Sequence, residues 1–218
     1  GALSGVLGAC GRAGQQPTPA INLVGDFGGG GLMLAFGMVS ALLAVKMGGA
    51  GQVVDCAMTD GSALLMAMMW GYRADGRWSE ARGTNLLDTG APFYDTYETA
   101  DGLHVAIGAI EPQFYAALRK VLGIDGDALF DAQMDEAQWP AQKRRLAAIF
   151  RTRTRDAWVQ AFAGHDACVT PVLAMGECTA HPQIAGRGTF IEVGGVVQPA
   201  PAPRFSATPS APPPPPSA

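Results

Sequence analysis

The sequence predicts an α/β protein in two parts, a helical first part and a separate α+β unit. An apolar run at helical spacing fills residues 30–47, which predicts a long helix. Two alternating runs meet at residues 100–102 (ADG), as the strands of a β-hairpin do. Between them, residues 75–92 lose periodicity and carry the Gly, Asp, Asn and Pro of a linker. With 218 residues, 48% of them hydrophobic, the chain can bury a core.

The first part is predicted to begin with two helices. Residues 3–13 (LSGVLGACGRA) favour a helix of small residues, and residues 21–24 (INLV) look strand-like. In residues 30–47 apolar side chains occupy every helical face, so this helix is expected to be buried on all sides.

A strand and another helix are expected after the glycines at 48 and 49. Residues 52–58 (QVVDCAM) predict the strand. Thr59 or Asp60 is then expected to cap a helix that continues through residues 62–74 (SALLMAMMWGYRA).

The α+β unit begins with the predicted hairpin, residues 93–110 (FYDTYETADGLHVAIGAI). A helix follows with Pro112 at its first position. Further helices are expected at about 136–150 and 154–163, and a short strand near 189–193. The second hairpin strand would turn one set of side chains to the same face: Leu103, Val105, Ile107 and Ala109.

Charge and residue spacing exclude several classes of function. A net charge of −4 and a pI near 5.3 argue against a nucleic-acid partner, which needs a basic face. The four cysteines form no C-x-x-C pair and the histidines have no metal-ligand spacing, so neither a metal site nor a redox dithiol is predicted. The thiols are expected to be reduced, as in a cytoplasmic protein.

No membrane span is predicted, because the longest apolar run, residues 32–45, stops at Lys46 and is too short for a bilayer. The chain has no signal-peptide pattern, begins with Gly and stops inside SAPPPPPSA. Both ends are therefore expected to be cut from a longer protein.

The glycine-rich stretch NLVGDFGGGG (residues 22–31) fails three familiar motifs. A protein kinase has its strand lysine before the Asp-Phe-Gly triplet, whereas Lys46 follows Asp26. A P-loop needs a lysine and a hydroxyl residue after its last glycine, and Leu32 and Met33 stand there. The dinucleotide pattern G-x-G-x-x-G lacks its third glycine in every register.

Two carboxylates are candidates for chemistry. Asp26 precedes the long helix, so its carboxylate is expected near a helix N-terminus, where free N–H groups can stabilise an oxyanion. A purely capping role for Asp26 is the alternative. Glu111 precedes the helix that starts at Pro112, where Glu is a weak N-cap, and this hints at a further role. Glu111 is expected to stay ionised and to hold a partner that becomes cationic.

The three histidines are interpreted as structural. His104 would point outward from a strand, and His181 precedes a proline and shapes a turn. His165 lies in a loop, GHDACVTPV (residues 164–172), and a general-base role is left open for it although no nucleophile neighbours it.

Three motifs stand together in this chain: NLVGDFGGG (22–30), LLDTGAPFYDTYETADG (86–102) and GAIEPQFYAAL (108–118). On these motifs the chain resembles the α-methylacyl-CoA racemases of the family III CoA-transferase superfamily. The likeness extends through GQVVDCAMTDG (51–61), DACVTPVL (166–173) and PAPRFS (201–206), and so covers residues 3 to 206 approximately.

The resemblance implies the family III CoA-transferase fold, in which a Rossmann-like large domain and a small α+β domain form an interlocked homodimer. Residues 1–58 would be the remaining part of the large domain, and 59–92 a connecting helix and linker. The small domain would span 93–180, and a returning linker with a Pro-rich tail 181–218. The N-terminal part of the large domain, which supplies much of the CoA pocket, would be absent.

The resemblance also implies an active site between subunits. Asp26 would be one acid/base group, and a histidine from a G-H-D motif would act on the opposite face of the substrate α-carbon. Glu111 of the partner chain would pair with that histidine. Asn22 would hydrogen-bond Asp26. The substrate would contact a further set of residues: Gly25, Phe27, Gly28 and Gly29.

The catalytic histidine of the family falls about five residues before Gly1 when the pattern is counted back, and this base is needed for inversion. His165 cannot replace it by sequence, because it stands in the DACVTPVL region. The resemblance therefore places one base inside the chain and the other outside it.

The implied activity is racemisation of 2-methylacyl-CoA thioesters through an enolate, in lipid and fatty-acid metabolism. No metal or redox cofactor is expected, since coenzyme A is part of the substrate. One alternative is acyl-CoA:carboxylate CoA transfer with Asp26 as the nucleophile. Another is that the chain is a non-catalytic fragment.

Overall fold

The computed structural model describes residues 2–215, and the chain divides into two compact units, Gly1–Thr170 and Pro171–Ala218. The boundaries expected at residues 58, 92 and 180 are not tested by this division and stay predictions.

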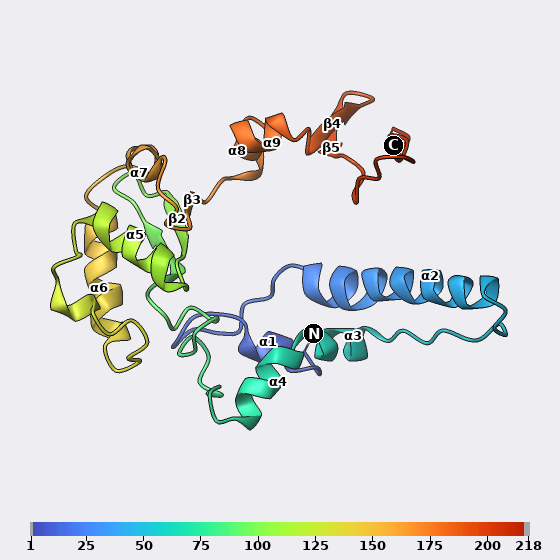
Figure 1. The fold of residues 1–218 in the computed structure, drawn as a ribbon, viewed down its shortest axis with the longest axis horizontal. Coiled ribbons are helices and arrows are strands. Elements are labelled where there is room, and N and C mark those ends of the chain that lie inside the picture. Colours follow the sequence, from blue (N-terminus) through green and yellow to red (C-terminus); the bar gives the residue numbers. More distant parts are fainter. Residues whose placement is uncertain (1, 216–218) are drawn as a thin grey trace. The chain divides into compact units, whose positions relative to one another are not determined.

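The first unit begins with helices. Their bounds are α1 Val6–Ala9, the π-helix η1 Leu23–Leu32, α2 Met33–Lys46, α3 Met58–Leu65 and α4 Ala67–Ala74 (Figure 1). Helix α1 is shorter than the expected helix over residues 3–13. The single helix expected through residue 74 is two, because the chain breaks at Met66, which leaves helical geometry at φ −92° and ψ 8°.

Both strands predicted in this part are wrong. Residues 21–24 form a turn and the start of η1, and residues 51–57 are extended without a ladder. Figure 1 shows the latter segment running back beside α2, where Val54 lies 3.0 Å from the Cβ that a side chain at Gly37 would carry. A strand needs a partner strand, and here the neighbour is a helix whose backbone groups are already bonded.

The prediction that the long helix is buried on all sides is also wrong for this chain. Helix α2 has no buried residue, and Phe36 and Val39 are exposed. Apolar side chains on every face of α2 indicate that burial of each face away from water would be favourable. It does not show which segment covers each face.

The helix pair η1 and α2 also bears on the absence of a membrane span. Leu23–Lys46 is 24 residues long with a mean hydropathy of 1.8, and 11% of its most apolar window is buried. By length and composition this helix could cross a bilayer, because η1 extends it upstream of the run that the sequence suggested. The absence of a membrane span therefore stays a prediction.

The rest of the first unit is the α+β unit, as predicted. Strands β1 Tyr94–Glu98 and β2 His104–Gly108 pair antiparallel with Glu98 opposite His104, and β3 Val169–Pro171 completes the order β1-β2-β3. The helical elements are α5 Pro112–Leu122, the 3₁₀ helix η2 Ala128–Phe130, α6 Trp139–Phe150 and α7 Arg155–Phe162. The hairpin and the helix after Pro112 are thus confirmed, whereas β3 was not expected.

One face of this sheet carries the main core. Val105, Ile107 and Ala109 are buried, as the alternation predicted, while Leu103 stays 41% exposed at the turn. Side chains of α5, α6 and α7 pack against that face, and the core contains several aromatic residues: Phe93, Tyr97, Tyr115, Phe130, Trp139, Phe150, Trp158 and Phe162. This core holds the strand end and the helix start between which Glu111 lies.

The second unit contains the short helices α8 Met175–Cys178 and α9 Pro182–Gly186, and a hairpin of β4 Phe190–Val193 and β5 Val196–Pro199. The strand predicted near 189–193 is β4. Its partner was missed because Gly194-Gly195, both at positive φ, form a tight turn with no polar signal beyond the two glycines.

Candidate active site

Asp26 lies in the first turn of η1, so it is near a helix N-terminus as expected, although the sequence analysis began the helix after Asp26, at about residue 30. Its backbone N–H donates to the carbonyl of Asn22 at 3.2 Å, and that of Phe27 donates to the same oxygen at 3.3 Å. The Phe27 bond spans five residues, as in a π-helix, an uncommon element that is frequent at functional sites. The Asp26 side chain is exposed, so it is accessible to a ligand.

A small cavity of about 180 Å³ lies beside Asp26, with Gly25, Ile21 and Cys10 among its lining residues. Burial raises the pKa of the Cys10 thiol, and the Arg82 guanidinium only partly opposes this effect. Cys10 therefore remains a neutral thiol near pH 7 and does not supply a second base next to Asp26.

The glycines after Asp26 have different surroundings. A Cβ at Gly29 would lie 2.6 Å from the backbone nitrogen of Ser62, and a Cβ at Gly30 would lie 3.0 Å from the Cγ of Met58. Close packing of η1 on the α3 backbone thus requires glycine at position 29, whereas a Cβ at position 30 would only require the Met58 side chain to move slightly. Of the other predicted substrate contacts, Gly25 borders the cavity, Gly28 is half-buried and Phe27 is 60% exposed.

Asn22 is the N-cap residue of η1, and its side chain makes no capping hydrogen bond. The Asp26 N–H donates to the Asn22 carbonyl as part of the helical backbone, which does not test the predicted hydrogen bond between these residues. The side-chain hydrogen bond stays a prediction.

Glu111 is the N-cap residue of α5, with Pro112 at the first helical position. Its backbone is extended, at φ −69° and ψ 144°, and its carbonyl accepts from the Tyr115 N–H at 3.0 Å. The carboxylate makes no capping hydrogen bond and is exposed. Capping therefore does not account for a Glu at this position.

The charge of Glu111 affects Cys168, in the loop before β3. Burial raises the pKa of the Cys168 thiol, and the carboxylates of Asp166 and Glu111 raise it further. Cys168 also has φ 50°, a left-handed conformation that is unusual for a residue with a side chain. Its carbonyl accepts from the Gly108 N–H at 2.9 Å, which ties this loop to the end of β2.

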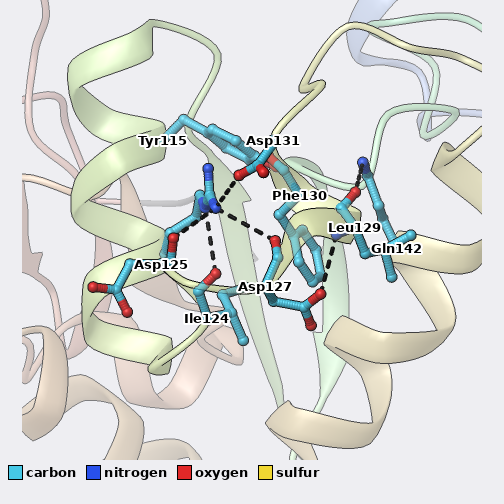
Figure 2. Close-up of polar contacts among 9 residues, drawn as sticks. Tyr115, Ile124, Asp125, Asp127, Leu129, Phe130, Asp131 and Gln142 are labelled. Carbon is cyan, nitrogen blue, oxygen red and sulfur yellow. Dashed lines mark hydrogen bonds and ion pairs between the residues drawn. The ribbon is translucent and has the colours of Figure 1, made fainter.

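Helix α5 is fixed at its far end by the turn of residues 124–131, shown in Figure 2. The guanidinium of Arg119 donates to the carbonyl of Asp125 at 2.8 Å and to the carboxylate of Asp131 at 2.7 Å. The Tyr115 hydroxyl donates to the Phe130 carbonyl at 3.1 Å, and Gln142 donates to the Leu129 carbonyl at 2.8 Å from the other side. These contacts hold α5 and α6 to one turn.

The structure does not bring the two predicted acids together in one chain. The cavity that Asp26 borders is lined by residues 2–26 alone, without Glu111. None of the three histidines lines it either. His104 is exposed on β2, His165 lies in the loop after α7, and His181 is the N-cap residue of α9.

A charged cluster that the sequence analysis missed joins the two parts of the first unit. The Asp95 carboxylate, 2% exposed, contacts a guanidinium nitrogen of Arg12 and the Nζ of Lys143, each at 2.7 Å. Arg12 also donates to the Thr96 hydroxyl at 2.7 Å, and Lys143 donates to the Thr89 carbonyl. The sequence did contain a signal for this cluster. Asp95 alternates with the apolar residues Phe93 and Tyr97, so it lies at an inward position of the strand, where a charged side chain needs a partner.

The described part of the chain, residues 2–215, contains no group of three or more His, Cys, Asp or Glu side chains that could hold a metal ion. All four cysteines are free thiols. The expectation that no metal or redox cofactor takes part is not tested by this geometry.

Comparison with known proteins gives a consistent assignment. The family described as CoA-transferase family III matches residues 1–218. Two curated proteins named alpha-methylacyl-CoA racemase, from Mus musculus and Homo sapiens, are 49% and 47% identical over 212 residues, which is 97% of this chain and 55% of each of theirs. An acetyl-CoA:oxalate CoA-transferase from Acetobacter aceti is 29% identical over 203 residues. The chain spans about half the length of the curated relatives it matches.

Solved structures agree on the fold. A crystal structure of Rv3272 from M. tuberculosis has a TM-score of 0.72 at 19% identity, covering 98% of this chain and 57% of that one. A CAIB/BAIF family protein from Brucella suis has a TM-score of 0.70 at 23% identity, covering 95% and 55%. The predicted family III CoA-transferase fold is thereby confirmed.

Proposed function

The chain belongs to CoA-transferase family III, and from that premise we propose that it acts in the racemisation of 2-methylacyl-CoA thioesters at the α-carbon. The observation that carries the proposal is the identity of 49% and 47% with two racemases over 97% of the chain, against 38% with a CaiB/baiF CoA-transferase family protein and 29% with two proteins named as CoA transferases.

The chemistry requires a base on each face of the α-carbon and donors for the enolate oxygen. A thioester α-proton is only weakly acidic, so its removal needs a positioned base and stabilisation of the charge that moves to oxygen. Asp26 supports the first role, because its carboxylate is exposed at the start of a helix. The positive end of that helix favours the developing enolate near it.

The second base is the histidine that the resemblance implies about five residues upstream of Gly1, so the proposal concerns a protein that carries both groups. Glu111 then pairs with that histidine and stabilises its protonated form. The proposal includes the homodimer that the resemblance implies, in which Glu111 of one copy approaches the site of the other; within one chain, Glu111 does not line the cavity beside Asp26.

The remaining features of the proposal follow from the substrate. Coenzyme A enters as part of the acyl-CoA thioester. Removal and return of the α-proton change no oxidation state, and the proposal includes no metal or redox cofactor. We assign the activity to fatty-acid metabolism in the cytoplasm, with no membrane span and no nucleic-acid partner. The net charge of −4 supports the last of these.

The test is exchange of the α-proton in the full-length protein. Incubation with a 2-methylacyl-CoA thioester in D₂O is expected to place deuterium at the α-carbon, and Asp26→Asn is expected to lose that exchange. Asp55→Asn is the matched control, because Asp55 is an exposed acid in the segment before α3. Normal exchange in Asp26→Asn would remove Asp26 from the mechanism.

CoA transfer is the second candidate, favoured by the transferase relatives and by an exposed carboxylate that could attack a thioester carbonyl. Asp26 would form an acyl anhydride and then an aspartyl-CoA thioester. Hydroxylamine added during turnover would then modify Asp26 and inactivate the protein. A racemase forms no such adduct and keeps its activity.

A further inference from the structure

Gln133 makes contacts at the junction that presents Glu111. Its side-chain Nε2 donates to the carbonyl of Ile110 at 2.8 Å and to that of Ala109 at 3.2 Å. These are the two residues immediately before Glu111. Gln133 comes from the irregular segment between η2 and α6, more than twenty residues further along the chain.

The two carbonyls lie where the sheet ends. Strand β2 stops at Gly108, and the Ala109 N–H still donates to the Phe93 carbonyl at 3.0 Å. Among the described residues, no strand pairs with the chain beyond that point, so the carbonyls of residues 109 and 110 need another donor. One amide NH₂ group carries two hydrogens and can serve both.

Gln133 is itself held in place from the core. The main-chain carbonyl of Gln133 accepts from the indole N–H of Trp139 at 2.9 Å. The Trp139 ring is buried and meets the Phe93 ring edge to face, with centroids 6.0 Å apart. Phe93 in turn accepts from Ala109. The contacts thus form a closed ring of residues around the β2–α5 junction: Ala109, Phe93, Trp139 and Gln133.

The contacts of Gln133 affect where the Glu111 side chain leaves the main chain. The peptide planes before Glu111 are fixed by Gln133, and the Glu111 carbonyl is fixed by the Tyr115 N–H in the first turn of α5. Because the carboxylate makes no capping bond, these backbone restraints are what fix the point and direction from which the side chain leaves the main chain. A shift of about 1 Å in a positioned group can cost a large part of a catalytic effect.

We propose that Gln133 is a positioning residue for Glu111, one that fixes the β2–α5 junction so that the Glu111 carboxylate meets its cationic partner. This inference rests on the proposed function, in which Glu111 pairs with the protonated base. Gln133 touches neither the substrate nor the reacting atoms. Its effect on the reaction passes through Glu111.

The test is a double-mutant cycle in the full-length protein. Gln133→Met keeps the side-chain length and removes the NH₂ donors, and it is expected to lower kcat for α-proton exchange about tenfold with little change in KM. In a Glu111→Gln background the same substitution is expected to have almost no further effect, because the group it positions is gone. Equal effects in both backgrounds would overturn the proposal.

Gln142→Met is the matched control. Gln142 also donates its side-chain amide to a carbonyl, that of Leu129, but this bond lies at the 124–131 turn and away from Glu111. Both methionine variants are expected to lower the midpoint of thermal unfolding, since Gln133→Met leaves two carbonyls without their donor and Gln142→Met leaves one. Only Gln133→Met is expected to show coupling to Glu111.

A readout without turnover separates this proposal from the proposed function. The pKa of the Cys168 thiol, raised by burial and by the charges of Asp166 and Glu111, is measured from the pH dependence of its alkylation. Glu111→Gln is expected to lower it, Gln133→Met to lower it partly, and Gln142→Met to leave it unchanged. An inactive wild-type protein would refute racemisation, and the thiol titration would still decide on Gln133. An unchanged Cys168 pKa in Gln133→Met would overturn the positioning role.

Discussion

The cluster around Asp95 gives the most quantitative prediction about stability. The carboxylate accepts from two Arg12 nitrogens, at 2.7 and 3.1 Å, from Lys143 at 2.7 Å and from the Thr96 N–H at 2.7 Å. Asp95→Asn keeps the shape of the side chain but removes the charge and places an NH₂ group against two cations. The variant is therefore expected to be less stable than the wild type.

The exposure of the partners sets the magnitude. Removing one member of a fully buried ion pair costs about 3–5 kcal/mol, because the remaining charge cannot reach water. Here the Arg12 and Lys143 side chains are 43% and 26% exposed, so both can turn partly toward solvent. We expect Asp95→Asn to lower the free energy of unfolding by about 2–3 kcal/mol.

Urea unfolding followed by tryptophan fluorescence measures this change, because Trp139 and Trp158 are buried in the adjoining core. The control is Glu80→Gln, which breaks an ion pair between Arg73 and Glu80 whose side chains are 53% and 78% exposed. That variant is expected to stay within about 0.5 kcal/mol of the wild type. If Asp95→Asn were equally neutral, the charge cluster would not hold the two parts of the unit together.

Two further predictions concern packing and pH. Gly29→Ala is expected to lower the free energy of unfolding by about 1–3 kcal/mol, since its Cβ would lie 2.6 Å from the Ser62 nitrogen and would disturb the contact of η1 with α3. Gly71→Ala is the control, because a Cβ at this position in α4 has open space around it and should be neutral or stabilising. Both variants are measured in the same urea titration. A comparable loss in both variants would contradict the packing argument. Burial raises the pKa of Tyr115 from 10.0 to about 12, so the stability from its neutral hydroxyl is complete below pH 10 and is lost as the pH rises through about 12. Tyr115→Phe is expected to flatten that part of the pH–stability curve, and an unchanged curve would count against this role for Tyr115.

The α+β unit could be predicted closely because its signals are local. Alternation in residues 93–110 around a tight turn specifies a hairpin, and the inward set Val105, Ile107 and Ala109 is the buried one. Pro112 fixes the first turn of α5, so Glu111 could be placed at the helix N-cap from sequence alone.

The first part was harder, because its structure depends on non-local neighbours. Residues 52–58 have the composition of a strand, but the chain offers them no strand to pair with, and they run beside α2 instead. The glycines at 28–31 read as a boundary before the helix. They lie inside η1, where Gly29 and Gly30 allow the close approach of α3.

The candidate site also has features that one segment predicts and contacts that depend on distant segments. That Asp26 lies near a helix N-terminus followed from the order of its neighbours, although the helix begins at Leu23 and not after Asp26. The contacts of Gln133 with residues 109 and 110, and those of Arg12 and Lys143 with Asp95, join segments far apart in the chain. No spacing rule within one segment reports such contacts.

The stereochemical course of the reaction tests the central claim most directly. The full-length protein is given one pure epimer of a 2-methylacyl-CoA thioester, together with a free carboxylic acid, and both the configuration at the α-carbon and the carrier of coenzyme A are followed. The account predicts that the other epimer appears until the two reach equilibrium, and that coenzyme A stays on its original acyl group. Retention of configuration with transfer of coenzyme A to the added acid would contradict racemisation and assign Asp26 to nucleophilic catalysis.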